Sequence, residues 1–143
     1  MNTALLCLLC VGLLPMICAG ISKSKLDYDN KNPRAWLARQ SGFRLRANSA
    51  QQNSWEAFLW FAVAILAVHS SDKVKITEVE VMAIFYVVLR IFYIAAYVSD
   101  FAMLRTVFWS IAFILNIIIL VKVRCEIAEK TRAHQRGIRA RWK

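Results

Sequence analysis

An arginine and two tyrosines share one face of a long apolar stretch. Arg90, Tyr93 and Tyr97 stand at positions i, i+3 and i+7, which places them on one stripe of an α-helix. An ionisable residue in a membrane-length helix usually faces the interior of a helical bundle, because hydrocarbon solvates charge poorly. A fixed guanidinium beside a thiol favours the nucleophilic thiolate, so this stripe suits chemistry on a bound thiol compound.

Three further polar residues are expected in the same layer. Asn53 and Glu56 begin one apolar stretch, and Arg105 begins another. If successive helices run antiparallel, both positions reach the membrane side where Arg90 lies. Two desolvated cations facing one carboxylate would favour a bound anion, such as a small anionic peptide. In the alternative, structural interpretation, Glu56 pairs with Arg90 and Arg105 extends to the membrane interface.

The elements that must position these residues are apolar helices. The chain is 59% hydrophobic, with a mean hydropathy of +0.45 and only 4 Gly and 2 Pro. It contains four stretches near the roughly 20 residues that a spanning helix requires, at about 3–21, 50–69, 78–98 and 101–121. We therefore expect one all-α domain over residues 1–143, an integral membrane four-helix bundle with a basic loop at 22–49 and a basic tail at 122–143.

The first stretch allows two interpretations. It could be a secretory signal peptide, but it lacks a basic start and is longer than the usual apolar core, which favours a retained helix. Cys7 and Cys10 within it have no second pair or nearby histidine, so we expect packing residues and no metal site. Thr77 and Glu80 have the spacing of a capping box.

Basic residues flank the apolar stretches and give a net charge of +10. This pattern favours contact with anionic lipids over nucleic-acid binding. Both basic segments cannot be cytoplasmic if four spans are present, and we place the loop 22–49 in the cytoplasm because early helices dominate orientation. Within it, Asn32-Pro33 resembles a helix start, and residues 33–48 are expected to be helical and to lie at the interface with Trp36 and Phe43 as anchors.

These motifs together resemble the MAPEG family, the membrane-associated proteins in eicosanoid and glutathione metabolism. The family motif Arg-Ala-x-x-Asn-x-x-Glu is similar to Ser49-Ala50-Gln51-Gln52-Asn53-Ser54-Trp55-Glu56, with Ser in place of the leading Arg. Arg90-Ile-Phe-Tyr93-Ile-Ala-Ala-Tyr97 and the following Arg105 resemble its next two motifs. The resemblance covers about residues 33–121 and is greatest to bacterial members.

The resemblance implies a four-helix protomer, a homotrimer and glutathione bound as co-substrate between subunits. It implies that Arg105 stabilises the thiolate, that Gln51 contributes from the adjacent subunit, and that the remaining contacts come from Asn53, Glu56, Arg90, Tyr93 and Tyr97. Arg46, one turn before Ser49, is a candidate replacement for the missing arginine.

The implied function is a glutathione transferase or peroxidase that acts on lipophilic electrophiles or lipid hydroperoxides. It would be a multi-pass protein, in a bacterial inner membrane, in contact with membrane lipids. The alternative is a non-catalytic membrane protein of the same fold that binds lipid or serves as a scaffold.

Overall fold

The computed structural model describes residues 3–70 and 76–141, and within these ranges the secondary structure is entirely α-helical. The helices are α1 (Thr3–Ser22), α2 (Pro33–Ala38), α3 (Gly42–His69), α4 (Ile76–Val98) and α5 (Ala102–Arg141). The expected all-α fold is therefore confirmed for the described residues.

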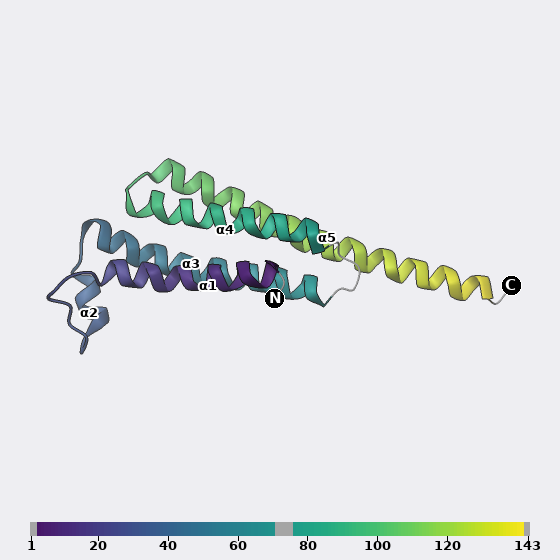
Figure 1. Ribbon diagram of the computed structural model, residues 1–143, viewed down its shortest axis with the longest axis horizontal. Helices are drawn as coiled ribbons and strands as arrows, with labels where there is room; N and C mark the ends of the chain where they lie inside the picture. Colours follow the sequence, from purple (N-terminus) through teal and green to yellow (C-terminus); the bar gives the residue numbers. More distant parts are fainter. Residues whose placement is uncertain (1–2, 71–75, 142–143) are drawn as a thin grey trace.

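The four long helices run in alternating directions and pack side by side (Figure 1). α1 packs along α3 and α4 packs along α5, while contacts of α4 with α1 and of α3 with both α4 and α5 join the two pairs. The antiparallel packing of α3 against α4 agrees with the prediction from the short connection between them. The polar N-terminal part of α3 and the C-terminal part of α4 consequently lie at the same end of the molecule.

The interior is formed by tightly packed apolar side chains. Phe61, Ile65 and Ile119 are fully buried, and the Phe61 ring stacks on Tyr86 with 4.2 Å between ring centroids. Alanines are also buried where helices meet, at Ala64, Ala83 and Ala112. Because lipid is as apolar as these side chains, close packing that small residues permit is what favours helix association in a membrane.

Three of the described helices are long and apolar enough to cross a membrane: Thr3–Ser22, Thr77–Val98 and Ala102–Cys125. They correspond to the first, third and fourth predicted spans. α3, which contains the predicted span 50–69, does not meet the same hydropathy criterion. The reason is its polar first half, which carries Gln51, Gln52, Asn53 and Glu56.

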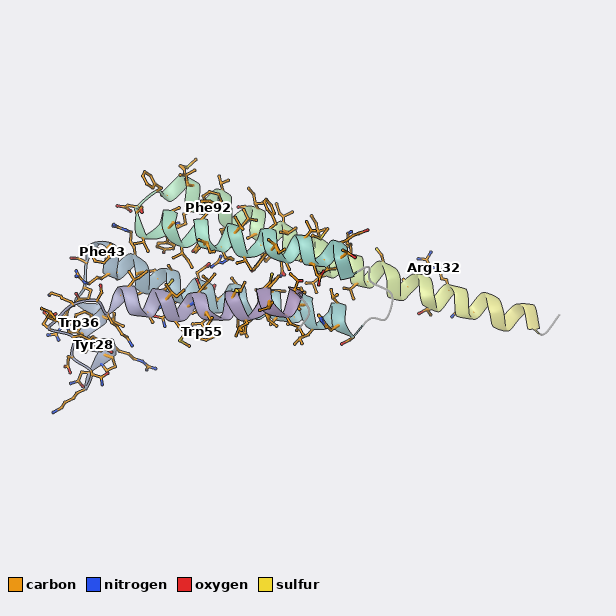
Figure 2. All side chains as sticks on the ribbon, viewed as in Figure 1. Tyr28, Trp36, Phe43, Trp55, Phe92 and Arg132 are labelled. Atoms are coloured by element: carbon orange, nitrogen blue, oxygen red, sulfur yellow. The ribbon has the colours of Figure 1, made fainter. Side chains whose placement is uncertain are left out.

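The expected helix in the basic loop is divided into two. Residues 33–48 do not form one helix, because the chain leaves α2 after Ala38 and α3 begins at Gly42, whose φ is +62°. Trp36 is buried and meets the Tyr28 ring edge-on at 5.1 Å, so it packs within the loop and is not an exposed anchor (Figure 2). Phe43 is exposed, as the prediction requires.

The start of α2 is organised by Asp29. Pro33 occupies the first turn as predicted, but the Asn32 side chain makes no capping hydrogen bond. Asp29 instead accepts hydrogen bonds from the backbone N–H groups of Lys31 and Asn32, at 2.9 and 3.2 Å. These bonds favour the ionised form and lower the pKa of the Asp29 carboxyl.

The expected capping box of Thr77 and Glu80 was wrong, because α4 begins at Ile76 and Thr77 lies inside the helix. The Glu80 Oε1 instead accepts a hydrogen bond from the backbone N–H of Thr3 at 3.2 Å. This bond ties the start of α1 to the start of α4. At the other end of the chain, α5 continues from the predicted fourth span into the basic tail without a break, to Arg141.

The last part of α5 extends beyond the other helices (Figure 1). Lys122 pairs with Glu78 near the start of α4, so the extension begins just after that point. At 1.5 Å per residue, residues 123–141 add about 28 Å of helix. Arg132 lies on this extension (Figure 2).

Arg46 fastens α3 to the turn between α4 and α5. Its Nε donates to the Val98 carbonyl oxygen at 3.0 Å, and its Nη1 pairs with Asp100 at 3.2 Å. Asp100 has a φ of +70°, which confirms the predicted turn at Ser99-Asp100. Arg46 therefore satisfies a carbonyl at the end of a helix, where a cation is also favoured by the helix dipole.

We expect Arg46→Met to lower the free energy of unfolding by about 1–2 kcal/mol, because it removes the bond to the helix end as well as the ion pair. Asp100→Asn should cost less than about 0.5 kcal/mol, since the carboxylate is 73% exposed and asparagine tolerates positive φ. Unfolding in detergent measures both. Equal losses would mean that the ion pair, and not the carbonyl bond, dominates.

Candidate functional site

Arg90 is the most deeply buried charge among the described side chains, with 1% of its surface exposed. Its Nη2 donates to Asn53 Oδ1 and to Ser54 Oγ, both at 3.2 Å. Its guanidinium carbon lies 4.2 Å from the centre of the Tyr93 ring. The polar turn of α3 and the helical stripe of α4 therefore meet at this side chain, as the antiparallel arrangement predicted.

The stripe continues from Arg90 to α5 through aromatic rings. Tyr93 and Tyr97 contact each other edge-on, with 5.7 Å between ring centroids. The guanidinium carbon of Arg105 lies 4.6 Å from the centre of the Tyr97 ring. Two guanidinium groups are thus joined through two phenol rings, along roughly 10 Å of α4 from residue 90 to residue 97.

The two guanidinium groups have no carboxylate partner in the described part of the chain. Among carboxylates whose side chains are described, none forms an ion pair with Arg90 or Arg105. The interpretation in which Glu56 pairs with Arg90 is therefore wrong for this chain, and Glu56 is exposed. Because arginine stays protonated, two positive charges remain available to a ligand.

Asn53, Glu56 and Arg90 line a cleft of about 70 Å³ between α3, α4 and α5. Trp60, Trp109 and Phe113 contribute aromatic walls, and Asn116 of α5 completes the lining. Sequence reasoning assigned no role to Ser54 or Asn116. The available signal for Asn116 was an amide within an otherwise apolar helix.

Gln51 lies apart from this cluster. At about 100° per residue it points about 200° away from Asn53 around α3. It lines a groove of about 520 Å³ with Gln52 and Arg34. Trp55, which lines the same groove, lies on the side of the α1–α3 pair away from α4 and α5 (Figure 2). One chain therefore does not bring Gln51 together with Arg90.

Ser49 stands where the family motif has an arginine, and neither Ser49 nor Arg46 supplies a cation to the Arg90 cluster. The Ser49 hydroxyl donates to the Leu45 carbonyl oxygen at 3.2 Å, within its own helix. Arg46, the candidate replacement, is engaged with Val98 and Asp100. The described site therefore relies on Arg90 and Arg105 for its positive charge.

The arrangement is suited to binding an anion and stabilising a second negative charge. Arg105 is half-buried, so it is accessible to a ligand that also contacts Tyr97. In the described residues, no group of three or more His, Cys, Asp or Glu side chains is placed to hold a metal ion. The side chains of the site offer guanidinium, amide, phenol and carboxylate groups.

Comparison with known proteins identifies the family. The family model of MAPEG matches residues 3–125, from the first turn of α1 to the part of α5 that packs on the other helices. Searches of curated proteins and of solved structures gave no match. The matched region contains the complete cluster around Arg90 and Arg105, as well as the three apolar helices. The chain therefore belongs to the MAPEG family.

Proposed function

We propose that the protein is a membrane-bound enzyme that uses glutathione to conjugate lipophilic electrophiles or to reduce lipid hydroperoxides. The observation that carries this proposal is the pair of guanidinium groups, Arg90 and Arg105, which are linked through Tyr93 and Tyr97 and form no ion pair with any carboxylate that the structure describes. Membership of MAPEG supports it, because the family includes glutathione transferases and peroxidases.

Glutathione matches this set of groups chemically. It carries two carboxylates, one amine, two peptide groups and one thiol. Arg90, with Asn53 beside it, would bind a carboxylate, and Glu56 would bind the amine. Tyr93 and Tyr97 would contact the peptide between the two cations.

Arg105 would hold the sulfur as thiolate. The thiolate sulfur donates an electron pair to the electrophilic carbon and forms a C–S bond, and the leaving group or the displaced electron pair carries away the negative charge. With a hydroperoxide, the thiolate attacks the distal oxygen, the O–O bond breaks, and the lipid alkoxide leaves and takes up a proton to become an alcohol. The resulting sulfenic acid reacts with a second glutathione to give disulfide and water.

We further propose that the chain spans the membrane four times and assembles as a homotrimer. In this proposal α3 crosses the membrane in addition to α1, α4 and α5. Gln51 supports the assembly, because its groove faces away from the Arg90 cluster of its own chain and would serve a site that is shared with a neighbouring chain. Exposed apolar side chains on α3, α4 and α5 support contact with lipid or with other subunits; they include Leu59, Val63, Phe85, Phe92 and Ile114. A bacterial inner membrane is the proposed location.

Calorimetric titration of glutathione into the detergent-purified protein tests the binding step. We expect saturable binding that weakens more than about tenfold in Arg90→Met, because a charge-assisted hydrogen bond contributes about 1.5–3 kcal/mol. Glutathione monoethyl ester, which lacks one carboxylate, should also bind more weakly. Arg124→Ala is the matched control, since Arg124 lies on α5 outside the cluster.

Absence of binding to the wild-type protein would contradict the proposal. It would favour the alternative, a non-catalytic lipid-binding or scaffold protein in which the polar layer serves packing. That alternative requires Arg90→Met to disrupt the assembly, which size-exclusion chromatography would detect.

Arg105→Ala tests the chemical step. With glutathione and a chromogenic electrophile, we expect the turnover rate to fall about 100-fold or more, because the variant removes a preorganised charge at the thiolate. The pKa of the bound thiol should rise, so the ultraviolet absorbance of the thiolate should appear at higher pH than in the wild type. An unchanged titration and rate would remove Arg105 from the mechanism.

A further inference from the structure

The cleft between α3, α4 and α5 contains polar atoms that lack hydrogen-bond partners. Asn116 is 1% exposed, and neither its Nδ2 nor its Oδ1 bonds to any described group. The Nε of Arg90 is also buried and unpaired, although Nη2 of the same side chain bonds to α3. A buried donor or acceptor without a partner is strongly unfavourable, so these atoms require a polar neighbour.

The cleft has the size and polarity that water requires. Its volume is about 70 Å³, whereas one water molecule needs only about 10–15 Å³ of such space. Asn116, Arg90 and Glu56 all contribute to its lining, which gives a water molecule several polar partners. Cavities lined only by apolar groups stay dry, and this cleft does not belong to that class.

We infer that this cleft is an internal hydration site in which water bridges the Asn116 amide to Arg90 Nε, and that Asn116 is thereby a positioning residue for Arg90. A water molecule accepts the Nε–H bond and donates to Asn116 Oδ1. A second water accepts from Asn116 Nδ2 and donates to Glu56. Each of the three unpaired atoms, Arg90 Nε, Asn116 Nδ2 and Asn116 Oδ1, gains one hydrogen-bond partner in this arrangement.

The bridge would complete the fixation of the Arg90 guanidinium. Its Nη2 is held by Asn53 and Ser54 of α3, and its face lies over Tyr93 of α4. Water on Nε adds a connection to α5 through Asn116. Held from three helices, the guanidinium keeps one orientation, which leaves the two N–H groups of Nη1 to donate to a ligand carboxylate at a fixed position.

The hydration site can be tested without glutathione. A cryo-electron microscopy structure of the full chain in a lipid nanodisc, at a resolution that shows ordered water, should contain density within hydrogen-bond distance of both Asn116 and Arg90 Nε. An empty cleft would overturn the inference. So would an Asn116 side chain that bonds to a lipid or to a neighbouring subunit.

The positioning role rests on the proposed function and is tested through glutathione affinity. We expect Asn116→Leu to weaken glutathione binding about tenfold in calorimetry, because the water bridge is lost while the number and branching of the side-chain heavy atoms are kept. Asn116→Gln should stay within about threefold of the wild type, since it retains the amide and the cleft admits one more methylene. Unchanged affinity in Asn116→Leu would overturn the positioning role.

Ile119→Val is the control for a loss of packing. Ile119 is fully buried on α5, one turn from Asn116, and does not line the cleft. This variant should lower the thermal midpoint and leave glutathione affinity unchanged. An equal loss of affinity in Ile119→Val and Asn116→Leu would mean that general loosening of α5 is responsible, which would overturn the role. If the wild type does not bind glutathione, the proposed function fails, and the nanodisc structure alone decides the hydration site.

Discussion

The burial of the Arg90 guanidinium is the constraint on which the arrangement of the helices depends. A fully desolvated cation must be surrounded by groups that accept its hydrogen bonds or its charge. α3 supplies the Asn53 and Ser54 oxygens, and α4 supplies the Tyr93 ring. The polar turn of α3 must therefore lie beside Arg90, and this requirement fixes the relative height and rotation of the two helices. It also explains why the first half of α3 is too polar to resemble an ordinary span.

In the described part of the chain, the groups that bond or stack directly with the Arg90 guanidinium are neutral, and this has a chemical consequence. A carboxylate in the same position would cancel the charge within the protein. Amide, hydroxyl and aromatic groups stabilise the cation but leave its charge uncompensated. The same holds for Arg105, which lies over the Tyr97 ring. The structure thus stabilises two cations without neutralising them, a condition that favours an anionic ligand at this layer.

Polar contacts also set the register of the helices at both ends. Arg46 joins α3 to the α4–α5 turn at one end, while Glu80 bonds to Thr3 and Lys122 pairs with Glu78 at the other. Between these ends, apolar side chains pack through contacts that have little directionality. The directional bonds at the two ends therefore oppose the sliding of one helix past another. The hydrogen bonds of Arg90 in the central cluster oppose it at a third place.

The sequence alone determined the helical class, the apolar lengths and the faces of single helices. The stripe of Arg90, Tyr93 and Tyr97 follows from the helical period, and the convergence with Asn53 follows from antiparallel order. The same residues carried the resemblance to MAPEG, and the family match confirms that membership. The proposal of glutathione as ligand follows from the resemblance.

The tertiary structure decided which side chains become partners. It gave Arg90 neutral partners where Glu56 was a candidate, engaged Arg46 elsewhere, buried Trp36, and placed Asn116 beside the cluster. These outcomes depend on the rotation and height of one helix relative to another. Sequence periodicity fixes angles only within a helix, whereas contacts between helices are set by the packing of whole surfaces.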